Sequence, residues 1–205
     1  MRKRVRHLFN LSGSVRLLLL SALLFLTGLF SIELIWGQAV ENARKVNQIL
    51  VKLKDPKQGT APEKFEISER ELNDFIAAAI EINKPKGMRK MVMDLQGNNQ
   101  FYARAFVRTE DIELEGVAGK ALKSMFQGDQ LVEAEGSIRI EKKKMSYDLS
   151  KTRINGLVIP SSMASDLAAF LIQARPPHIN IREPFDLPYG IAEVRIEKSK
   201  LIVER

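Results

Sequence analysis

The sequence predicts an α+β domain that follows one N-terminal transmembrane helix. Three observations predict this class: a long uncharged apolar segment near the N-terminus, repeated pairs of alternating runs separated by short polar turns, and two segments with the spacing of amphipathic helices. Strands joined by short turns form an antiparallel sheet, here expected to be curved, and two helices can cover one of its faces. A chain of 205 residues with 45% hydrophobic content has room for one anchor and one domain of ordinary size.

Residues 17–36 are the predicted membrane anchor. Leu17 to Ile32 carries no charge, and the apolar run resumes after Glu33 and ends at Trp36, so the segment is long enough to cross a hydrocarbon core of about 30 Å. Trp36 suits the interface, and Glu33 lies within a turn of it, where its carboxylate can reach headgroup water. A polar contact between Glu33 and a partner helix is the alternative.

The residues before the anchor predict its orientation. Residues 1–16 form a basic tail without acids, and the positive-inside rule keeps such a tail in the cytoplasm. We therefore expect a single-pass protein of the bacterial inner (cytoplasmic) membrane, with its C-terminal domain periplasmic or extracellular. A cleaved signal peptide is the alternative, because Gly37-Gln38-Ala39 offers small residues, although the apolar run is longer than a usual signal-peptide core.

The net charge of +7 and the pI of 9.6 invite a nucleic-acid partner until the charges are located. Five of the seven excess charges lie in the tail before the first acid, Glu33. We therefore expect no nucleic-acid binding. The absence of cysteine excludes disulfides and thiolate metal sites.

Residues 37–64 are predicted to form a stalk helix and a linker, which places the extracytoplasmic domain at 65–205. A helix over 38–54 is expected to continue the membrane helix, and the polar segment from Asp55 to Pro62 is typical of a linker. The apolar positions that share one side of this helix are Val46, Ile49, Leu50 and Leu53.

Ser68-Glu69-Arg70-Glu71 has the pattern of a capping box, which predicts that a helix begins there. Ile67 and Leu72 are placed as its hydrophobic staple, and Pro85 and Gly87 are expected to end the helix. Its apolar face consists of Leu72, Phe75, Ile76, Ala79 and Ile80.

Alternation of apolar and polar residues predicts strands in the rest of the chain. A first hairpin is expected at 91–95 and 101–107, then a strand at Ile112 and Leu114 and a short helix at 117–126. A second hairpin is expected at 132–140 and 145–149, with its turn at 141–144. Farther on, we expect a second amphipathic helix with Met163, Leu167, Phe170, Leu171 and Ala174 on one face, a strand at Ile179 and Ile181, and a last hairpin at 191–196 and 201–203.

Residues that could carry catalysis are sparse. His7 lies in the tail, and His178 has no second histidine near it in the sequence. The acids around 109–115 predict a solvated strand face, with weak divalent binding as the alternative. No phosphate-binding loop or metal motif occurs. We therefore expect no enzyme, no cofactor and no metal site.

Two kinds of surface could bind a ligand. Lys142, Lys143 and Lys144 lie at a hairpin tip and form either a solvated turn or a contact with anionic headgroups, each lysine contributing about 1 kcal/mol there. The apolar helix faces form either an ordinary core or the lining of an elongated cavity for acyl chains. The residues expected to line such a cavity are Leu72, Phe75, Ile76, Ile80, Leu167, Phe170 and Leu171.

Several segments show a family resemblance. Ile67 to Phe75 (ISERELNDF), the alternating run 138–149, Leu157-Val-Ile-Pro160 and the closing run 187–203 resemble small anchored domains of the LmeA-like and YpmS-like bacterial families. The resemblance implies a fold akin to the tubular lipid-binding proteins, in which a curved sheet wraps helices and holds lipids by apolar contacts. This chain departs from the pattern at 142–144 and at 198–199, where the turns lack the usual glycine.

The sequence thus supports two hypotheses of different class. The first is a membrane-tethered extracytoplasmic domain that binds a lipid or other apolar ligand without catalysis. The second is a structural or interaction subunit of an envelope membrane complex, with a closed core and an envelope protein as its partner.

Overall fold

A computed structural model describes residues 37–54, 62–111, 124–161, 163–164, 183–187 and 189–205. The predicted anchor lies outside these residues. So do the strand expected at Ile112 and Leu114, the strand expected at Ile179 and Ile181, and almost all of the two helices expected at 117–126 and 163–174.

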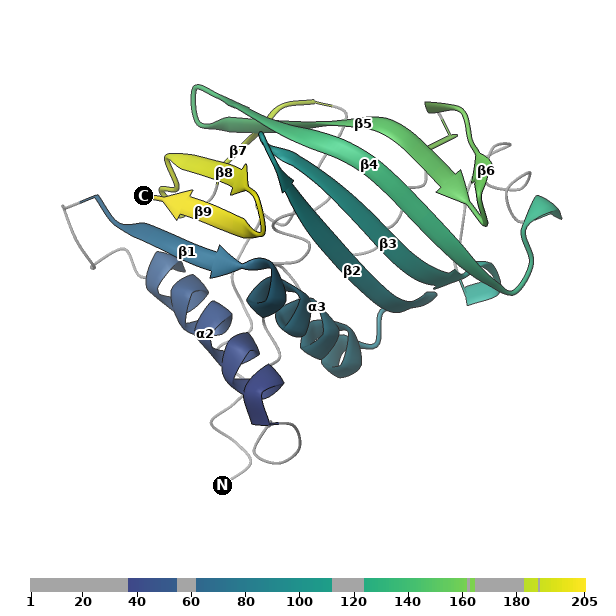
Figure 1. Cartoon of the computed structure of the whole chain (residues 1–205), viewed down its shortest axis with the longest axis horizontal. Coiled ribbons are helices and arrows are strands. Elements are labelled where there is room, and N and C mark those ends of the chain that lie inside the picture. The colour runs from purple at the N-terminus through teal and green to yellow at the C-terminus, as the bar shows by residue number, and fades with distance from the viewer. Residues whose placement is uncertain (1–36, 55–61, 112–123, 162, 165–182, 188) are drawn as a thin grey trace.

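The described residues form an α+β fold with a curved antiparallel sheet and two helices, which confirms that part of the predicted class (Figure 1). The larger sheet has the strand order β2-β3-β4-β5-β6, with β7 paired to β5, and a smaller sheet has the order β1-β9-β8. The elements are α2 (Gly37–Lys54), β1 (Lys64–Ser68), α3 (Glu69–Asn83), β2 (Met88–Gly97), β3 (Gln100–Arg108), η2 (Thr109–Asp111), β4 (Asp129–Glu141), β5 (Lys144–Ile154), β6 (Leu157–Val158), β7 (Phe185–Asp186), β8 (Glu193–Glu197) and β9 (Lys200–Glu204).

The predicted capping box is present at the start of α3. The Ser68 hydroxyl accepts a hydrogen bond from the Glu71 amide at 3.3 Å, and the Glu71 carboxylate accepts one from the Ser68 amide at 2.8 Å. The helix ends at Asn83, and Lys84 caps it in the left-handed conformation with a φ of 41°. All five predicted apolar positions of α3 are buried.

Helix α2 is packed into the folded domain, whereas we expected a stalk outside it. Its predicted apolar side is buried against α3, and Val46 and Leu53 are at most 1% exposed. Asn42 donates a hydrogen bond to Asp74 of α3 at 2.6 Å, and Lys45 lies 2.5 Å from Glu71. Because an apolar stripe exposed to water is unfavourable, this helix packs against the nearest apolar partner instead of standing free.

The three predicted hairpins are confirmed, and their two-residue turns explain how tightly they close. Asn98 and Asn99 have φ values of 52° and 60°, and Lys142 and Lys143 have 52° and 64°. Positive φ at both central positions is the geometry that matches the twist of a two-stranded ribbon. Lys142 and Lys143 therefore adopt a conformation that normally favours glycine or asparagine.

Strand β1 and the smaller sheet were not predicted. β1 pairs antiparallel with β9, from Lys64 opposite Glu204 to Ser68 opposite Lys200. The last hairpin, β8–β9, thus belongs to a second sheet instead of extending the large one.

Asn99 joins the two sheets. Its amide donates to the Ile196 carbonyl at 3.0 Å, and its side-chain oxygen accepts from the Ile196 amide at 2.9 Å. Its carbonyl accepts from the Ile138 amide at 2.9 Å, and Ser199 donates to the Leu95 carbonyl at 2.8 Å. The turn of the β2–β3 hairpin is therefore bonded both to β8 of the smaller sheet and to β4 of the larger one.

Candidate functional site on the inner face of the curved sheet

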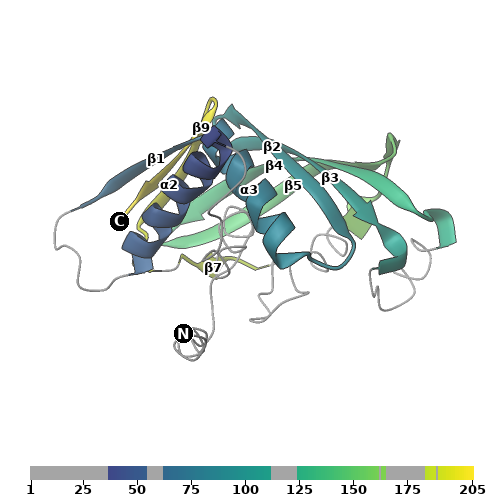
Figure 2. The ribbon, with the colours of Figure 1, turned by 90° about the horizontal axis from the view of Figure 1, so that it is seen from below.

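The large sheet is bent into an arch, and α3 lies on its concave side (Figure 2). Residues directly opposite each other in antiparallel strands share a face, so the register assigns the side chains of the concave side, which we call the inner face. None of the inner-face residues that the register assigns on β2 to β5 is charged. These residues are Met91, Met93, Leu95, Phe101, Ala103, Ala105, Val107, Gln130, Val132, Ala134, Gly136, Ile138, Ile140, Met145, Tyr147, Leu149, Thr152 and Ile154.

Helix α3 closes the inner face at β2. The Asn73 side chain donates to the Met93 carbonyl and accepts from the Met93 amide, both at 2.8 Å, and the Leu95 amide donates to Glu69 at 2.7 Å. These bonds satisfy the free edge of β2 and fix the helix along it. Met93 and Leu95 are accordingly almost fully buried.

Farther from α3, the inner face is less completely covered. Ile140 of β4 and Tyr147 and Leu149 of β5 are only partly buried, although they face the same side as the closed core. No described helix packs extensively on β4 or β5. Most other inner-face residues of β4 and β5, such as Ile138 and Met145, are buried, so the partly accessible part of this face is confined to a few positions.

Small side chains occupy the middle of this surface. Ala103 of β3 lies opposite Ala134 of β4, and Ala134 lies opposite Thr152 of β5. We call these three residues the central row. Because short side chains stand between larger ones, the central row forms the lowest part of the inner face.

Gly136, the next inner-face residue of β4, lacks a side chain for a steric reason. A Cβ atom at Gly136 would lie 2.8 Å from the Phe101 ring and 2.7 Å from the Asp148 carbonyl oxygen. The Phe101 ring, 2% exposed, thus occupies the space that a side chain at this position would need.

Two buried polar side chains interrupt the apolar surface. Gln130 is satisfied, because it donates to the Gln127 carbonyl at 2.5 Å and accepts from Asn155 at 2.6 Å. Thr152, at 5% exposure, is different: its hydroxyl has no hydrogen-bond partner.

One end of the sheet exposes apolar side chains, and we call it the uncharged end, residues 124–128 and 154–161. Met125, Leu157 and Val158 are 66%, 62% and 64% exposed. The two segments are adjacent, since Asn155 exchanges hydrogen bonds of 2.8 Å with Leu131 and also contacts Gln130.

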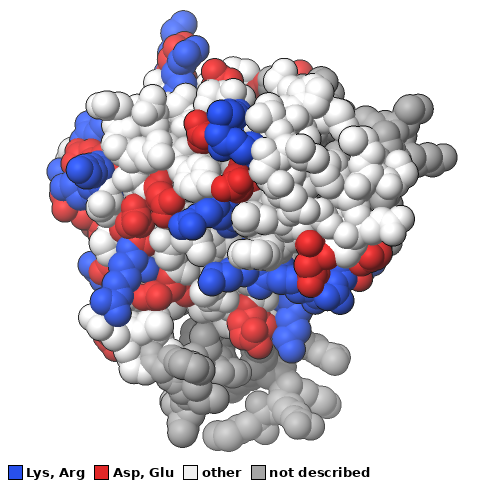
Figure 3. All heavy atoms as spheres, turned by 45° about the vertical axis from the view of Figure 1, so that its right-hand side comes forward, with Lys and Arg blue, Asp and Glu red and all other residues white. Residues whose placement is uncertain are grey.

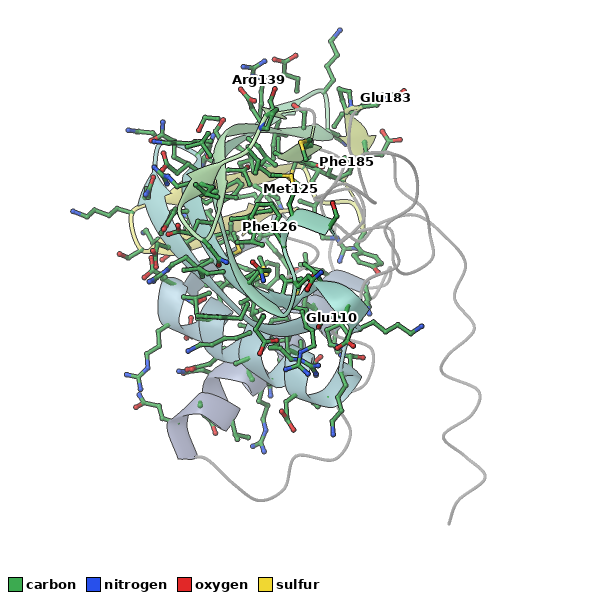
Figure 4. All side chains as sticks on the ribbon, turned by 90° about the vertical axis from the view of Figure 1, so that its right-hand side faces the viewer. Glu110, Met125, Phe126, Arg139, Glu183 and Phe185 are labelled. Carbon is green, nitrogen blue, oxygen red and sulfur yellow. The ribbon has the colours of Figure 1, made fainter. Side chains whose placement is uncertain are left out.

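The figures agree with this description of the uncharged end. Figure 3 shows a broad surface without charged side chains on that side of the molecule. In Figure 4, Met125 and Phe126 lie near the middle of this end, and Glu110 lies below them. Exposed clusters of this kind mark contact surfaces more often than the isolated apolar residues of an ordinary protein surface do.

The outer, convex face is charged and internally paired. Arg108 binds Asp129 through two hydrogen bonds of 2.8 and 3.1 Å, and Arg153 binds Glu135 at 2.9 Å. The hydrogen bond from Arg108 lowers the pKa of Asp129, and the bond between Tyr102 and Glu133 raises the pKa of Tyr102. These are solvated surface pairs, so the contrast between the two faces points to the inner face as the site.

The structure places the predicted site residues in three different situations. Leu72, Phe75, Ile76 and Ile80 of α3 are at most 7% exposed and belong to the closed part of the core. Leu167, Phe170 and Leu171 lie outside the described residues. Lys142, Lys143 and Lys144 are exposed at the β4–β5 tip, the opposite end of that hairpin from the uncharged end (Figure 1).

The predicted acidic cluster is only partly described. Asp111 pairs with Arg89 at 2.6 Å, and Glu110 accepts a hydrogen bond from the Gly128 amide at 2.8 Å. Across the part of the chain that the structure covers, no three His, Asp or Glu side chains gather closely enough to hold a metal ion.

Sequence reasoning missed the central row. Alanine and threonine contribute little to a hydrophobic pattern, and only the register shows that three strands place short inward residues side by side. The signal that was available is the spacing of Ala103 and Ala105 within an alternating strand.

Comparison with known proteins adds no relative, because no protein-family model, curated protein or solved structure matches this chain. The described helices also include none that is both long and apolar enough to cross a membrane.

Proposed function

We propose that this chain is a single-pass membrane protein whose domain, outside the cytoplasm, binds a lipid or another elongated apolar ligand without catalysing a reaction. The observation that carries the proposal is the inner face itself. It is largely apolar across four strands, has no charged side chain among its described residues, and is only partly buried at Ile140, Tyr147 and Leu149.

Simple energetics favour an apolar ligand at this surface. Burying a methylene group contributes about 0.8 kcal/mol, so an acyl chain that covers Ile140, Tyr147 and Leu149 would gain several such increments. The gain must exceed the loss of translational and rotational freedom on binding. A long hydrocarbon chain meets this condition more easily than a small polar molecule does.

The position of the proposed anchor supports a lipid as the ligand. The apolar segment 17–36 ends immediately before Gly37, the first residue of α2. If that segment spans the bilayer, the packed domain begins at the membrane surface, and the bilayer is the nearest source of an apolar ligand. The exposed Leu157 pairs with Ile154 of the inner face, so an uncharged, exposed side chain adjoins that face at the edge of the sheet.

A second candidate function has one observation in its favour. Leu72, Phe75 and Ile76 are 0% exposed, as expected for a closed core with no ligand. In that case the uncharged end would contact another envelope protein, and the chain would be an interaction subunit.

Mass spectrometry of organic extracts from the purified full-length chain tests the proposal. We expect a lipid in stoichiometric amount with the unaltered chain. Ala134→Leu, which fills the central row, should reduce the bound lipid severalfold, because the added side chain occupies the ligand's space. Ser137→Leu adds the same side chain on the outer face of the same strand and should have no effect.

Two results would contradict the proposal. One is an extract that contains no more lipid per protein than an unrelated single-pass protein purified in the same way. The other is an equal loss of lipid in both variants. A stoichiometric protein partner that binds through Leu157 would instead favour the interaction subunit.

A further inference from the structure

We infer that the ligand carries a neutral hydrogen-bond acceptor, of the kind an ester carbonyl provides, and that the hydroxyl of Thr152 donates to it. This inference rests on the proposed function and names the class of lipid: a neutral acyl ester, rather than a fatty-acid anion or a plain hydrocarbon.

The first step in the argument is that the Thr152 hydroxyl is buried and unpartnered. Thr152 is 5% exposed, and its side-chain oxygen makes no hydrogen bond. Its backbone carbonyl is already used, because it accepts from the Ile159 amide at 3.0 Å. A buried hydroxyl without a partner destabilises a protein, and native structures rarely leave one unsatisfied.

The second step concerns packing. Valine has nearly the same shape as threonine and would bury no hydroxyl, so packing alone does not require threonine here. Gln130, the other buried polar residue of the inner face, has partners for both its amide nitrogen and its oxygen. Of these two buried polar residues of the inner face, Thr152 is thus the one whose side chain lacks a hydrogen bond.

The third step concerns the neighbours of the hydroxyl. Thr152 ends the central row, and its neighbours across the strands are Ala134 and then Ala103. Both have short apolar side chains, so neither can be a hydrogen-bond partner of the hydroxyl. A row of small side chains that ends at a buried donor fits a ligand whose polar atom lies within an otherwise apolar body.

The fourth step excludes charged ligand groups from this position. The inner-face residues defined above include no lysine, arginine or histidine. A carboxylate or phosphate placed beside Thr152 would thus have no cation from the described inner face beside it, and an unpaired buried charge is strongly unfavourable. A neutral carbonyl oxygen needs only the one donor that Thr152 supplies.

Photo-crosslinking of the full-length chain in dodecyl maltoside micelles, whose detergent contains no ester, tests the inference. One preparation contains a diazirine-labelled diacylglycerol and the other a diazirine-labelled fatty acid, at equal mole fraction. Peptide mass spectrometry then measures the crosslinks on β3 to β5, apart from those on the anchor. We expect diacylglycerol to crosslink more than the fatty acid does.

Substitutions at one position separate the hydrogen bond from packing. Thr152→Val should lower the diacylglycerol crosslinks on these strands roughly two- to tenfold, the range that one hydrogen bond typically supplies. Thr152→Ser keeps the hydroxyl and should retain most of the yield. Thermal unfolding of Thr152→Val in detergent without added diacylglycerol should be unchanged or shifted upward, since the variant buries no unpartnered hydroxyl.

The outcomes distinguish the inference from the proposal beneath it. If neither lipid crosslinks to β3 to β5 in the unaltered chain, lipid binding itself fails. If both lipids crosslink there and Thr152→Val changes neither yield, lipid binding stands and the role of Thr152 is wrong. A preference for the fatty acid would likewise overturn the assignment of a neutral ester.

Discussion

At the scale of single residues, the inner face depends on where small side chains stand. Gly136 makes room for the Phe101 ring. In the central row, any larger side chain would extend over the neighbouring strands of the inner face. Steric fit, and not charge, therefore determines which substitutions this surface tolerates.

Gly136→Ala is expected to destabilise the fold by about 1–3 kcal/mol, the usual range for overpacking a filled core. The added methyl group would meet both the Phe101 ring and a backbone oxygen, and the backbone oxygen cannot move aside alone. Chemical denaturation of the purified chain measures the change. Gly37→Ala is the matched control, because a Cβ atom there meets nothing within 4 Å, and its midpoint should stay the same or rise. Equal midpoints for Gly136→Ala and the unaltered chain would show that the strands adjust freely.

At the scale of elements, the start of α3 combines local capping with a contact to α2. Burial on its own would raise the pKa of Glu71, but the hydrogen bonds from Lys45 and from Ser68 outweigh it, and the pKa lies below its ordinary value of 4.5. A carboxyl group with a lowered pKa in the folded state stabilises the fold above its unfolded-state pKa and loses that contribution as the pH falls through the folded-state pKa.

Glu71→Gln should therefore lower the free energy of unfolding at pH 7 by about 1 kcal/mol, a typical contribution of a helix cap. Its effect should shrink as the pH falls below 4.5 and through the lowered folded-state pKa of Glu71, because Glu71 is then protonated in the unaltered chain as well. Denaturation curves at several pH values check both statements. Glu81→Gln, an exposed position in the last turns of the same helix, serves as the control and should change little. A loss of stability that is the same at every pH would contradict this account.

The elements that the sequence predicted best are those determined by neighbouring residues. The capping box at Ser68 and the turns at 96–99 and 141–144 are local signals, and the structure confirms each of them. Strand β1 was missed because its partner, β9, lies more than 130 residues farther along the chain and no local pattern reveals a distant pairing.

The interpretation of α2 shows the same limit. Periodicity correctly predicted its apolar side, but it does not tell which surface will cover that side, so a stalk and a core helix have the same pattern. The candidate site is harder to predict from the sequence than either of these elements. The central row exists only after β3, β4 and β5 are aligned, and a slip of one residue would turn it outward.

At the scale of the whole molecule, α2 belongs to the folded domain, and its removal tests this directly. Deleting residues 1–36 should leave a folded domain, because the described core begins at Ala43, within α2 (Gly37–Lys54). Deleting residues 1–54 should abolish cooperative thermal unfolding, because it removes Val46, Leu50 and Leu53 and exposes the side of α3 that they cover. Circular dichroism during heating measures both. A cooperative transition in the shorter variant would show that α2 is only a stalk.

The pairing of β1 with β9 affects the order in which the two sheets can form during synthesis of the chain. Ribosomes deliver residues 64–68 long before residues 200–204, so the smaller sheet waits for nearly the whole sequence to be made. The turn at Asn99 waits as well, since Ile196 supplies two of its bonds. The smaller sheet therefore closes late, whereas the hairpins β2–β3 and β4–β5 join neighbouring strands and can pair earlier.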